Sequence, residues 1–383
     1  MRKRICSVLL LVIFLLAGCS AGAKDARPTE GENVVKLCAV GDIFPTADML
    51  TDAHKPNVGY DFTSQLSACF PALASADLAI GNFEGNFTAG SYGNGNYPDE
   101  LADTLARAGF DILQTANSYS IANGVSGLSR TKSVIEQAGM IPLGTFTDAQ
   151  DQKENQTLLV EVNDIRIAFV SFTKGFGGMG LPENAGHSVN LLYSDYTTNY
   201  DEVDTEGILA VLADARKKDP DIIIAALHWG SENTKDVSRS QEEIASLMFE
   251  NGVDVILGSH SHIVSAVEQR HIVLKDGTRK DVVLAYGLGD FCAAESGDCN
   301  MTLILNLEFT RNHSTGETKI TSLSYTPMAA VDRGKNEQDR YALLDVENEL
   351  ALYENNYYDR IGESLYNSLQ SGMERLKNAV SLN

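Results

Sequence analysis

Residues 254–262 read DVILGSHSH, an apolar run that ends on two histidines. The run predicts a buried strand up to Ser259, followed at once by His260 and His262. Two imidazoles placed after a buried strand cost free energy unless they find partners, so the pair suggests a binding site. In α/β folds, ligands collect beyond the carboxyl ends of the strands, which is where these histidines are expected.

Four other predicted strands end in the same way, on a polar residue of a type that binds metal. The endings are VVKLCAV into Gly41-Asp42, DLAIGNF into Glu84, DILQTA into Asn117-Ser118, and DIIIAAL into His228. Each has an ordinary alternative, because Asp42 could cap a helix or turn, Glu84 could be a solvated loop carboxylate, and His228 could be a satisfied imidazole. Together, the five endings predict one composite site.

The donor set of this site suits a divalent cation. Carboxylates, an amide or hydroxyl, and three imidazoles are the mixed oxygen and nitrogen ligands of Mn²⁺, Fe or Zn²⁺. A carboxylate such as Glu84 can bridge two ions, and paired ions are used to hydrolyse phosphoesters. The sequence therefore predicts one or two bound ions.

The amino terminus indicates export and lipidation. Residues 1–18 combine a basic start with an apolar run that is too short to span a bilayer, which is typical of a signal peptide. The run ends in Leu16-Ala17-Gly18-Cys19, which resembles the lipobox of bacterial lipoproteins and implies cleavage before a lipidated Cys19. Residues 19–33 are polar and predict a tether that holds the protein outside the cytoplasm on the bacterial membrane. The alternative is an ordinary secretory signal.

The charge balance argues against nucleic acid as a partner. The full chain has a formal net charge of −22, and removal of the signal leaves 27 basic and 52 acidic residues. Such a surface should not attract a polyanion through broad electrostatics, so an anionic ligand needs a local cationic centre. Cys292 and Cys299 flank an acidic loop, and the spacing leaves open a disulfide or two free thiols.

Strand-like and helix-like patterns alternate from residue 34 to about 335, which predicts one α/β domain with mixed sheets. Four helices are expected, at residues 99–109, 125–138, 202–217 and 241–251. Three hairpins are expected, at residues 158–172, 264–286 and 302–325. Residues 336–383 are charged and helical in periodicity, and predict a pair of helices packed on the domain or on a partner.

Seven segments resemble the CapA family of capsule and poly-γ-glutamate biosynthesis proteins, within the calcineurin-like metallophosphoesterase superfamily. They occur in order across about 300 residues, and the tail beyond Arg333 is not covered. The segments are AVGDIFP (39–45), ADLAIGNFEG (76–85), ELADTLARAGFDILQTAN (100–117), GLSRTKSVIEQAGMIPLGTF (127–146), ALHWGSE (226–232), DVILGSHSHIVSAVE (254–268) and AYGLGDF (285–291).

The resemblance implies a four-layer α/β/β/α sandwich of two mixed sheets. It also implies that Glu84 bridges two ions, with His228 and His260 on one ion and Asp42 and His262 on the other. Asn117 and Ser118 are further candidate ligands, and Tyr119 and His228 are the candidate catalytic residues. Other candidates within the matched segments are Asn82, Trp229, Glu232 and Glu268.

The chain also departs from the family pattern. Phe44 occupies the position of a histidine in the phosphoesterases, and Ser118 occupies the position of an expected asparagine ligand. Tyr119 replaces a histidine that would protonate the leaving group, and Ala122 replaces an aspartate of the family. A tyrosine, with an unperturbed pKa near 10, is a poor general acid at neutral pH. The site is therefore expected to bind metal but to be weakened as a catalyst.

These observations lead to three hypotheses. The first is a lipid-anchored protein that assists synthesis, export or anchoring of an anionic extracellular polymer together with membrane-embedded synthesis proteins. The second is an active metal-dependent hydrolase of a phosphoester or, with less support, of a γ-glutamyl amide. The third, a metal-free binding scaffold, requires all five ligand-type residues to have lost their role.

Overall fold

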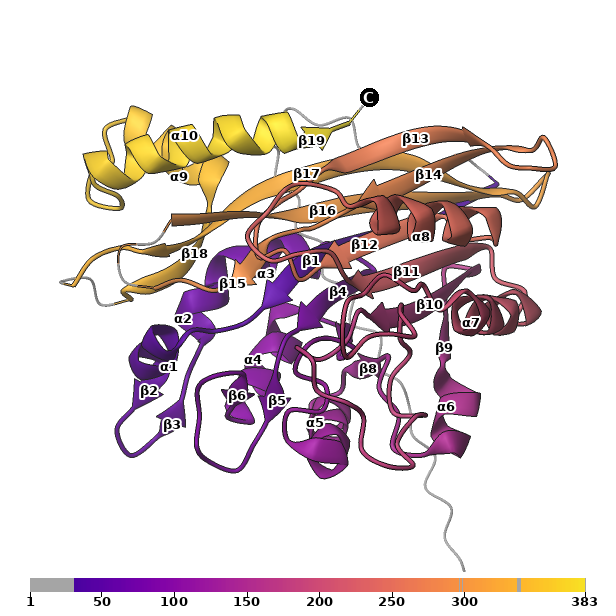
Figure 1. Ribbon diagram of the computed structural model, residues 1–383. Coiled ribbons are helices and arrows are strands. Elements are labelled where there is room, and N and C mark those ends of the chain that lie inside the picture. The colour runs from indigo at the N-terminus through magenta and orange to yellow at the C-terminus, as the bar shows by residue number, and fades with distance from the viewer. Residues whose placement is uncertain (1–30, 296, 298, 336–338, 383) are drawn as a thin grey trace, which may run out of the picture.

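Two mixed β-sheets lie face to face in the computed structural model, which describes residues 31–295, 297, 299–335 and 339–382 (Figure 1). The first sheet has the order β18-β17-β16-β1-β4-β7-β8, with β15 paired to the end of β1. Its strands β1, β4, β7 and β8 are parallel, whereas β16, β17 and β18 are antiparallel. The bounds are β1 (Glu32–Ile43), β4 (Leu78–Phe83), β7 (Ile112–Gln114), β8 (Ile141–Leu143), β15 (Asp290–Cys292), β16 (Cys299–Asn312), β17 (Thr318–Asp332) and β18 (Tyr341–Asp345).

The second sheet has the order β19-β13-β14-β12-β11-β10-β9. Its central strands β10, β11, β12 and β14 are parallel, so their carboxyl ends point the same way. The bounds are β9 (Thr157–Val162), β10 (Ile165–Thr173), β11 (Ile222–His228), β12 (Val255–Ser259), β13 (Val267–Val273), β14 (Arg279–Ala285) and β19 (Val380–Ser381).

The main hydrophobic core lies between the sheets, because alternate residues of each strand face inward. Leu37 of β1 and Ile80 of β4 pack there against Ile224 of β11 and Leu257 of β12. The outward-facing residues of the same strands are also apolar, so each outer face needs a covering layer of helices.

Helices cover both outer faces. The first sheet is covered by α1 (Ala47–Ala53), α2 (Thr63–Leu66), α3 (Phe70–Ala74), α4 (Glu100–Ala108) and α5 (Gly124–Gln137), and the second by α7 (Thr205–Lys217) and α8 (Arg239–Glu250). Local sequence sets their ends: Ser238 and Gln241 form a capping box at the start of α8, and Gly109 stops α4 with φ 106°. The short elements are β2 (His54–Lys55), β3 (Gly59–Tyr60), a 3₁₀ turn (Ser67–Cys69), β5 (Asn86–Phe87), β6 (Asn96–Tyr97) and α6 (Ala149–Asn155).

The predicted architecture is confirmed. The four predicted helices correspond to α4, α5, α7 and α8, and the three hairpins to β9–β10, β13–β14 and β16–β17. Helix, sheet, sheet and helix follow one another as the four expected layers (Figure 1).

The tail differs from the expected pair of helices, because a strand lies at each of its ends. Residues 341–345 form β18 at the edge of the first sheet, then α9 (Val346–Glu354) and α10 (Glu363–Ala379) follow, and β19 pairs with β13 of the second sheet. Leu369 and Leu376 of α10 join the core between the sheets. The tail is therefore built into both sheets, and α10 lies over the first sheet with its end beside the second (Figure 1).

Other predictions concern the chain ends and the cysteines. The signal peptide, the lipidation site at Cys19 and most of the tether lie outside the described residues, and β1 already begins at Glu32. Cys292 is a free, buried thiol, so the possible Cys292–Cys299 disulfide is not formed. Among the described residues, no helix combines the length and apolar character needed to cross a bilayer.

Candidate metal centre

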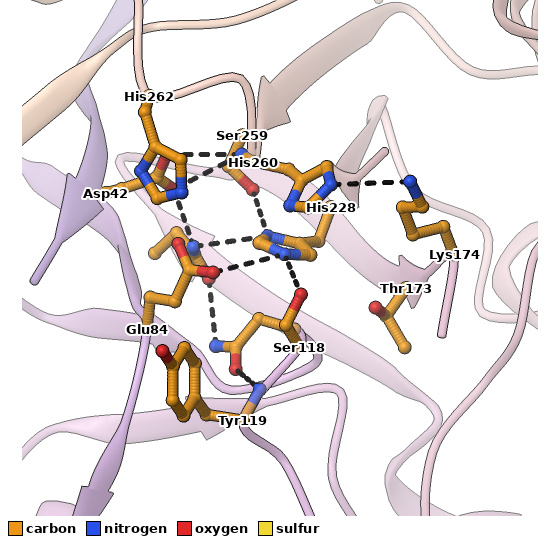
Figure 2. A network of polar contacts seen from close by, with 12 residues as sticks. Asp42, Glu84, Ser118, Tyr119, Thr173, Lys174, His228, Ser259, His260 and His262 are labelled. Atoms are coloured by element: carbon orange, nitrogen blue, oxygen red, sulfur yellow. Dashed lines mark hydrogen bonds and ion pairs between the residues drawn. The ribbon is translucent and has the colours of Figure 1, made fainter. Parts of the chain in front are cut away.

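The five strand-ending residues meet at one edge of the fold (Figure 2). Asp42 and Glu84 come from β1 and the end of β4 in the first sheet, whereas His228, His260 and His262 come from β11 and the loop after β12 in the second. Together with Asp290 they form two groups of three, each with ligand atoms within 4.8 Å of one another: Glu84, His228 and His260, and Asp42, His262 and Asp290. Both groups take side chains from both sheets.

The first group is fully enclosed. Glu84 and His228 are 1% and 0% exposed, and Oε1 of Glu84 lies 3.4 Å from Nε2 of His228. The rings of His228 and His260 are 4.5 Å apart between centroids. Two atoms of this group, Oε2 of Glu84 and Nδ1 of His260, are buried without a hydrogen-bond partner among the described residues. Buried polar atoms without partners are costly, and a cation at this position would satisfy them.

The hydrogen-bond partners of His228 are compatible with the tautomer that a metal ligand needs. Nδ1 lies 3.2 Å from the Ser259 hydroxyl, which can donate its own proton to the carbonyl oxygen of Leu227. The hydroxyl oxygen is then free to accept a hydrogen bond from Nδ1–H, and the lone pair is left on Nε2. Nε2 faces Glu84 and, at 3.0 Å, the Ser118 hydroxyl. Ser259 therefore orients the His228 imidazole, as hydrogen-bond partners do for histidines that bind metals.

The second group includes one residue that the sequence analysis missed. Asp290, at the start of β15, lies with Oδ1 2.8 Å from Nδ1 of His262. Asp42 is fully buried and accepts hydrogen bonds from Asn82, at 2.7 Å, and from the backbone N–H of His260, at 3.1 Å. Asp290 thus gives the second group two carboxylates and one imidazole.

A row of amides links the strand ends of the first sheet. Nδ2 of Asn82 donates to Asp42, and Oδ1 of Asn82 accepts from Nδ2 of Asn117 at 3.1 Å. The amide of Asn117 also donates to the Phe83 carbonyl and accepts from the backbone N–H of Tyr119. Asn82 and Asn117 therefore hold Asp42 and the loop with Ser118 in position.

Burial shifts the protonation of these groups in opposite directions. The pKa of Asp42 is raised to about 7, mainly by burial and further by the negative charge of Asp290. The pKa of Glu84 is also raised, mainly by burial and further by the negative charge of Asp42. Burial lowers the pKa of His228, and it lowers that of His260 to about 3 with a contribution from Lys174. Both imidazoles are therefore neutral at physiological pH and can offer a lone pair to a cation.

His262 behaves differently from the other two histidines. Burial opposes its charge, but the hydrogen bond that its ring N–H donates to Asp290 and the nearby carboxylates outweigh burial and raise its pKa to about 10. A cation bound to the second group would replace this proton. The carboxylates and imidazoles of the two groups fit the mixed donor set of Mn²⁺, Fe or Zn²⁺.

The loop after β12 has an unusual backbone. His260 has φ 91° and His262 has φ 59°, in the left-handed region that non-glycine residues seldom adopt. Such conformations cost free energy and concentrate at functional sites. On the opposite strand, a Cβ at Gly41 would lie 1.9 Å from the Gly289 carbonyl oxygen, so the glycine lets β1 approach the chain that carries Asp290.

Three substituted positions border the site. The Phe44 ring lies 5.5 Å from the Tyr119 ring and 6.1 Å from the His262 ring between centroids, so it adds an apolar wall where a ligand was expected. Burial and the charge of Glu84 raise the pKa of Tyr119 above its ordinary value. Tyr119 is therefore a still poorer proton donor at neutral pH than a free tyrosine. Ser118 is in contact with His228, as described above.

A cavity of about 260 Å³ opens beside His260. The main cation of this cavity is Lys174, which follows β10 and was not predicted from the sequence. The Lys174 ammonium donates to the Gly230 carbonyl at 2.6 Å, lies 3.4 Å from Nε2 of His260, and lies 4.5 Å from the Tyr200 ring centroid. The other lining residues are Ser118, Gly175, Gly177, Tyr200, Ser231 and Glu232. Glu232 therefore lines this cavity together with two other predicted residues, Ser118 and His260.

Trp229 and Glu268 have other surroundings. Trp229 is fully buried, and its indole N–H donates to the Tyr286 carbonyl at 3.0 Å beneath the site. Glu268 pairs with Arg270 on β13. Both residues are near metal-type residues in sequence, but these contacts give them structural roles.

Comparison with known proteins identifies the family of the chain. Residues 36–295 match the family model described as "Bacterial capsule synthesis protein PGA_cap". The chain is 26% identical over 296 residues to the capsule biosynthesis protein CapA of Bacillus anthracis, which covers 74% of the chain and 66% of that relative. It is 25% identical over 296 residues to the PGA biosynthesis protein CapA of Bacillus subtilis, which covers 74% of the chain and 69% of the relative. The chain thus spans about two thirds of the length of these relatives.

Among solved structures, similarity extends to a phosphatase from Mycoplasma pneumoniae, with TM-score 0.46, 15% identity, and coverage of 78% of this chain and 94% of that one. A calcineurin-like phosphoesterase from Bacillus subtilis has TM-score 0.43, 13% identity, and coverage of 77% and 90%. The family match covers well over half of the sequence and includes Asp42, Glu84, His228, His260, His262 and Asp290. The chain belongs to the bacterial capsule synthesis protein family PGA_cap.

Proposed function

We propose that this protein assists the synthesis, export or anchoring of an anionic extracellular polymer, poly-γ-glutamate or a related capsule. In this proposal the polymer's carboxylates bind at a divalent cation, and Cys19 anchors the protein by lipid to the outer face of the bacterial membrane. Membrane-embedded synthesis proteins would be its partners. The names of the two CapA relatives support the polymer class.

One observation carries the proposal: a buried and a partly buried group of metal-type ligands lie side by side in a strongly acidic chain. Glu84, His228 and His260 would hold one ion, and Asp42, His262 and Asp290 a second. Bound cations would supply positive charge for an anionic ligand and Lewis acidity toward an oxygen atom.

Lys174 adds a positive charge from the protein itself, beside that of any bound cation. Lys174 lies in the cavity beside His260 and can donate to an anionic oxygen of the ligand. Glu232 lines the same cavity, so a ligand there meets charges of both signs. A polymer with carboxylates and amide N–H groups has the complementary chemistry.

Asp290 favours a second candidate function, a metal-dependent hydrolase. The lack of a histidine at Phe44 predicted one incomplete ion site, but Asp290 gives the second group three ligands. Two adjacent ions suit phosphoester hydrolysis. Against this function stands Tyr119, whose raised pKa makes it a poor proton donor.

Elemental analysis of the chain beginning at Ala21 tests the metal centre first. One or two Mn, Fe or Zn ions per chain are expected, with a loss of at least one ion in His228→Ala. His271→Ala is the matched control, because His271, on β13, is an exposed histidine that pairs with Asp281. Absence of metal after Mn²⁺ and Zn²⁺ loading would leave only the scaffold hypothesis.

A second experiment separates the two functions. A deletion strain should lose surface polymer and regain it with the wild-type gene but not with His228→Ala. Purified wild-type protein should show background turnover on a panel of phosphoesters and γ-glutamyl amides in Mn²⁺. Unchanged polymer in the deletion strain would exclude the polymer role, and turnover that His228→Ala abolishes would establish the hydrolase. Radiolabelled lipid incorporation that Cys19→Ser abolishes tests the anchor.

A further inference from the structure

A second cavity opens on the other side of the metal centre, at His262. It has a volume of about 380 Å³, within the range of small-molecule sites. Its walls come from the loop after β12, the start of β16 and one side of α10. The lining residues are Lys235, His262, Ile263, Val264, Cys299, Asn300, Met301, Gly372, Arg375, Leu376, Asn378 and Ala379.

This cavity continues along α10 as an open polar groove. The groove has a volume of about 440 Å³ and shares Cys299 and Arg375 with the cavity. Its other lining residues lie on one face of α10: Ser364, Asn367, Ser368 and Ser371. A continuous path thus leads from hydroxyl and amide groups on the tail, past Arg375, to His262.

Two cations border the path, although the chain as a whole is strongly acidic. Lys235 and Arg375 are both exposed, and neither takes part in the ion pairs of the described residues. Their acidic sequence neighbours are Asp236 and Glu374, and Glu374 pairs with Lys377 at 2.9 Å. The backbone N–H of Asn233 donates to the Ser261 carbonyl at 2.9 Å, which ties the loop of Lys235 to the loop of His262.

One close contact lies between α10 and β16. A Cβ at Gly372 would lie 2.5 Å from Cγ and Sδ of Met301, so glycine allows the helix to lie directly on β16. Gly372 and Met301 are both in the wall of the cavity. The contact therefore sets the width of the path beside His262.

We infer that the cavity and groove along α10 bind a carboxylate-bearing segment of the polymer, with Lys235 and Arg375 contacting its carboxylates as it approaches His262. The inference rests on the proposed function and adds a role for the tail, which lies outside the matched residues 36–295. An extended chain can pass through an open groove, and its repeated carboxylates can meet cations spaced along it. Hydroxyl and amide groups of α10 suit the polymer's backbone amides.

The test is binding of fluorescein-labelled poly-γ-glutamate to the full-length chain, solubilised in detergent and loaded with Mn²⁺. Fluorescence anisotropy compares the wild type with Lys235→Glu, Arg375→Glu and the double variant. We expect each single variant to lose about threefold in affinity and the double variant about tenfold, with unchanged metal content, since exposed ion pairs are individually weak. The loss should shrink at high salt, which screens exposed charges.

Lys377→Glu is the matched control, because it makes the same charge change on α10 outside the two lining sets. It should change affinity less than twofold. Equal losses in Lys377→Glu and Arg375→Glu would overturn the inference in favour of non-specific charge. Wild-type affinity in the double variant, with affinity lost in His228→Ala, would overturn the tail's role alone. If the wild type does not bind the polymer, the proposed function and this inference both fail.

Discussion

Oδ1 of Asp290 lies 2.8 Å from Nδ1 of His262, in the second group of ligand-type residues. The chain has phenylalanine at position 44, where a histidine ligand was expected, and Asp290 lies on the strand paired to the end of β1. A carboxylate from β15 therefore lies in the group where an imidazole from β1 was expected. The second group therefore has three ligand-type residues, although the phenylalanine at position 44 alone would indicate that one ligand is missing.

Asp290→Ala should remove one ion from a protein that binds two, because the second group then retains only Asp42 and His262. Elemental analysis should give one ion fewer, and the ion held by Glu84, His228 and His260 should remain. Asp281→Ala is the control, since Asp281 makes a similar carboxylate–imidazole contact with His271 on the surface. Equal metal content in wild type and Asp290→Ala would remove Asp290 from the ligand set.

Lys174→Met should weaken the binding of an anionic polymer about tenfold without lowering metal content. A charged hydrogen bond contributes about 1.5–3 kcal/mol, and about 1.4 kcal/mol is a factor of ten. Calorimetry with short poly-γ-glutamate chains would measure the loss. Lys153→Met, at an exposed lysine of α6, makes the same charge change away from the cavity and should bind as the wild type does. Equal weakening in both variants would point to net charge.

Trp229→Phe should destabilise the fold by about 2 kcal/mol and leave metal content unchanged. The substitution removes the hydrogen bond to the Tyr286 carbonyl and leaves a small cavity in a fully buried site. Urea unfolding of the metal-free proteins would measure the difference in free energy of unfolding. A variant of normal stability that no longer bound metal would return Trp229 to the functional residues.

Asp151→Asn should destabilise the protein at neutral pH but not in strong acid. Burial opposes the charge of Asp151, but hydrogen bonds from Lys132, Thr147 and Asn155 outweigh it and lower the pKa from 3.8 to about 2. A lowered pKa gives stability that is complete above pH 3.8 and is lost as the pH falls to about 2. Because the pair is partly solvated, the effect at pH 7 should be about 1 kcal/mol.

Urea unfolding of wild type and Asp151→Asn at neutral pH and near pH 3 would measure this difference. The gap between the two proteins should narrow at the lower pH, because the Asp151 carboxylate of the unfolded wild type takes up a proton there while that of the folded protein stays mostly ionised. A gap of equal size at both pH values would show that the variant acts through packing, independently of the carboxylate charge.

The sequence predicted most of the site because its chemistry coincides with strand ends. Asp42, Glu84, His228, His260 and His262 each follow an apolar strand, and parallel strands bring such positions together. Lys174 also follows a strand, but β10 was interpreted as half of a hairpin with β9. Its second partner, β11, is parallel to it, and pairing across 50 residues of intervening chain leaves no local signal.

Asp290 was missed for a related reason, since it begins a short strand instead of ending one. Trp229 was selected because it adjoins His228, although alternate strand residues face opposite ways and the indole points into the core beneath α8. The strand at residues 341–345 was missed because five residues of mixed character do not outweigh the helical periodicity around them. Tertiary pairing decides such short segments.

Each ligand group takes residues from both sheets, so metal can bind only after the two sheets have packed together. Segments separated by more than 100 residues must already be packed together before either group exists, so the unfolded chain offers no comparable site. Nearly all of the binding free energy should then add to the stability of the folded protein, about 2.7 kcal/mol at a free metal concentration one hundred times Kd. The surrounding metal supply would therefore act as an external control on how long this protein survives.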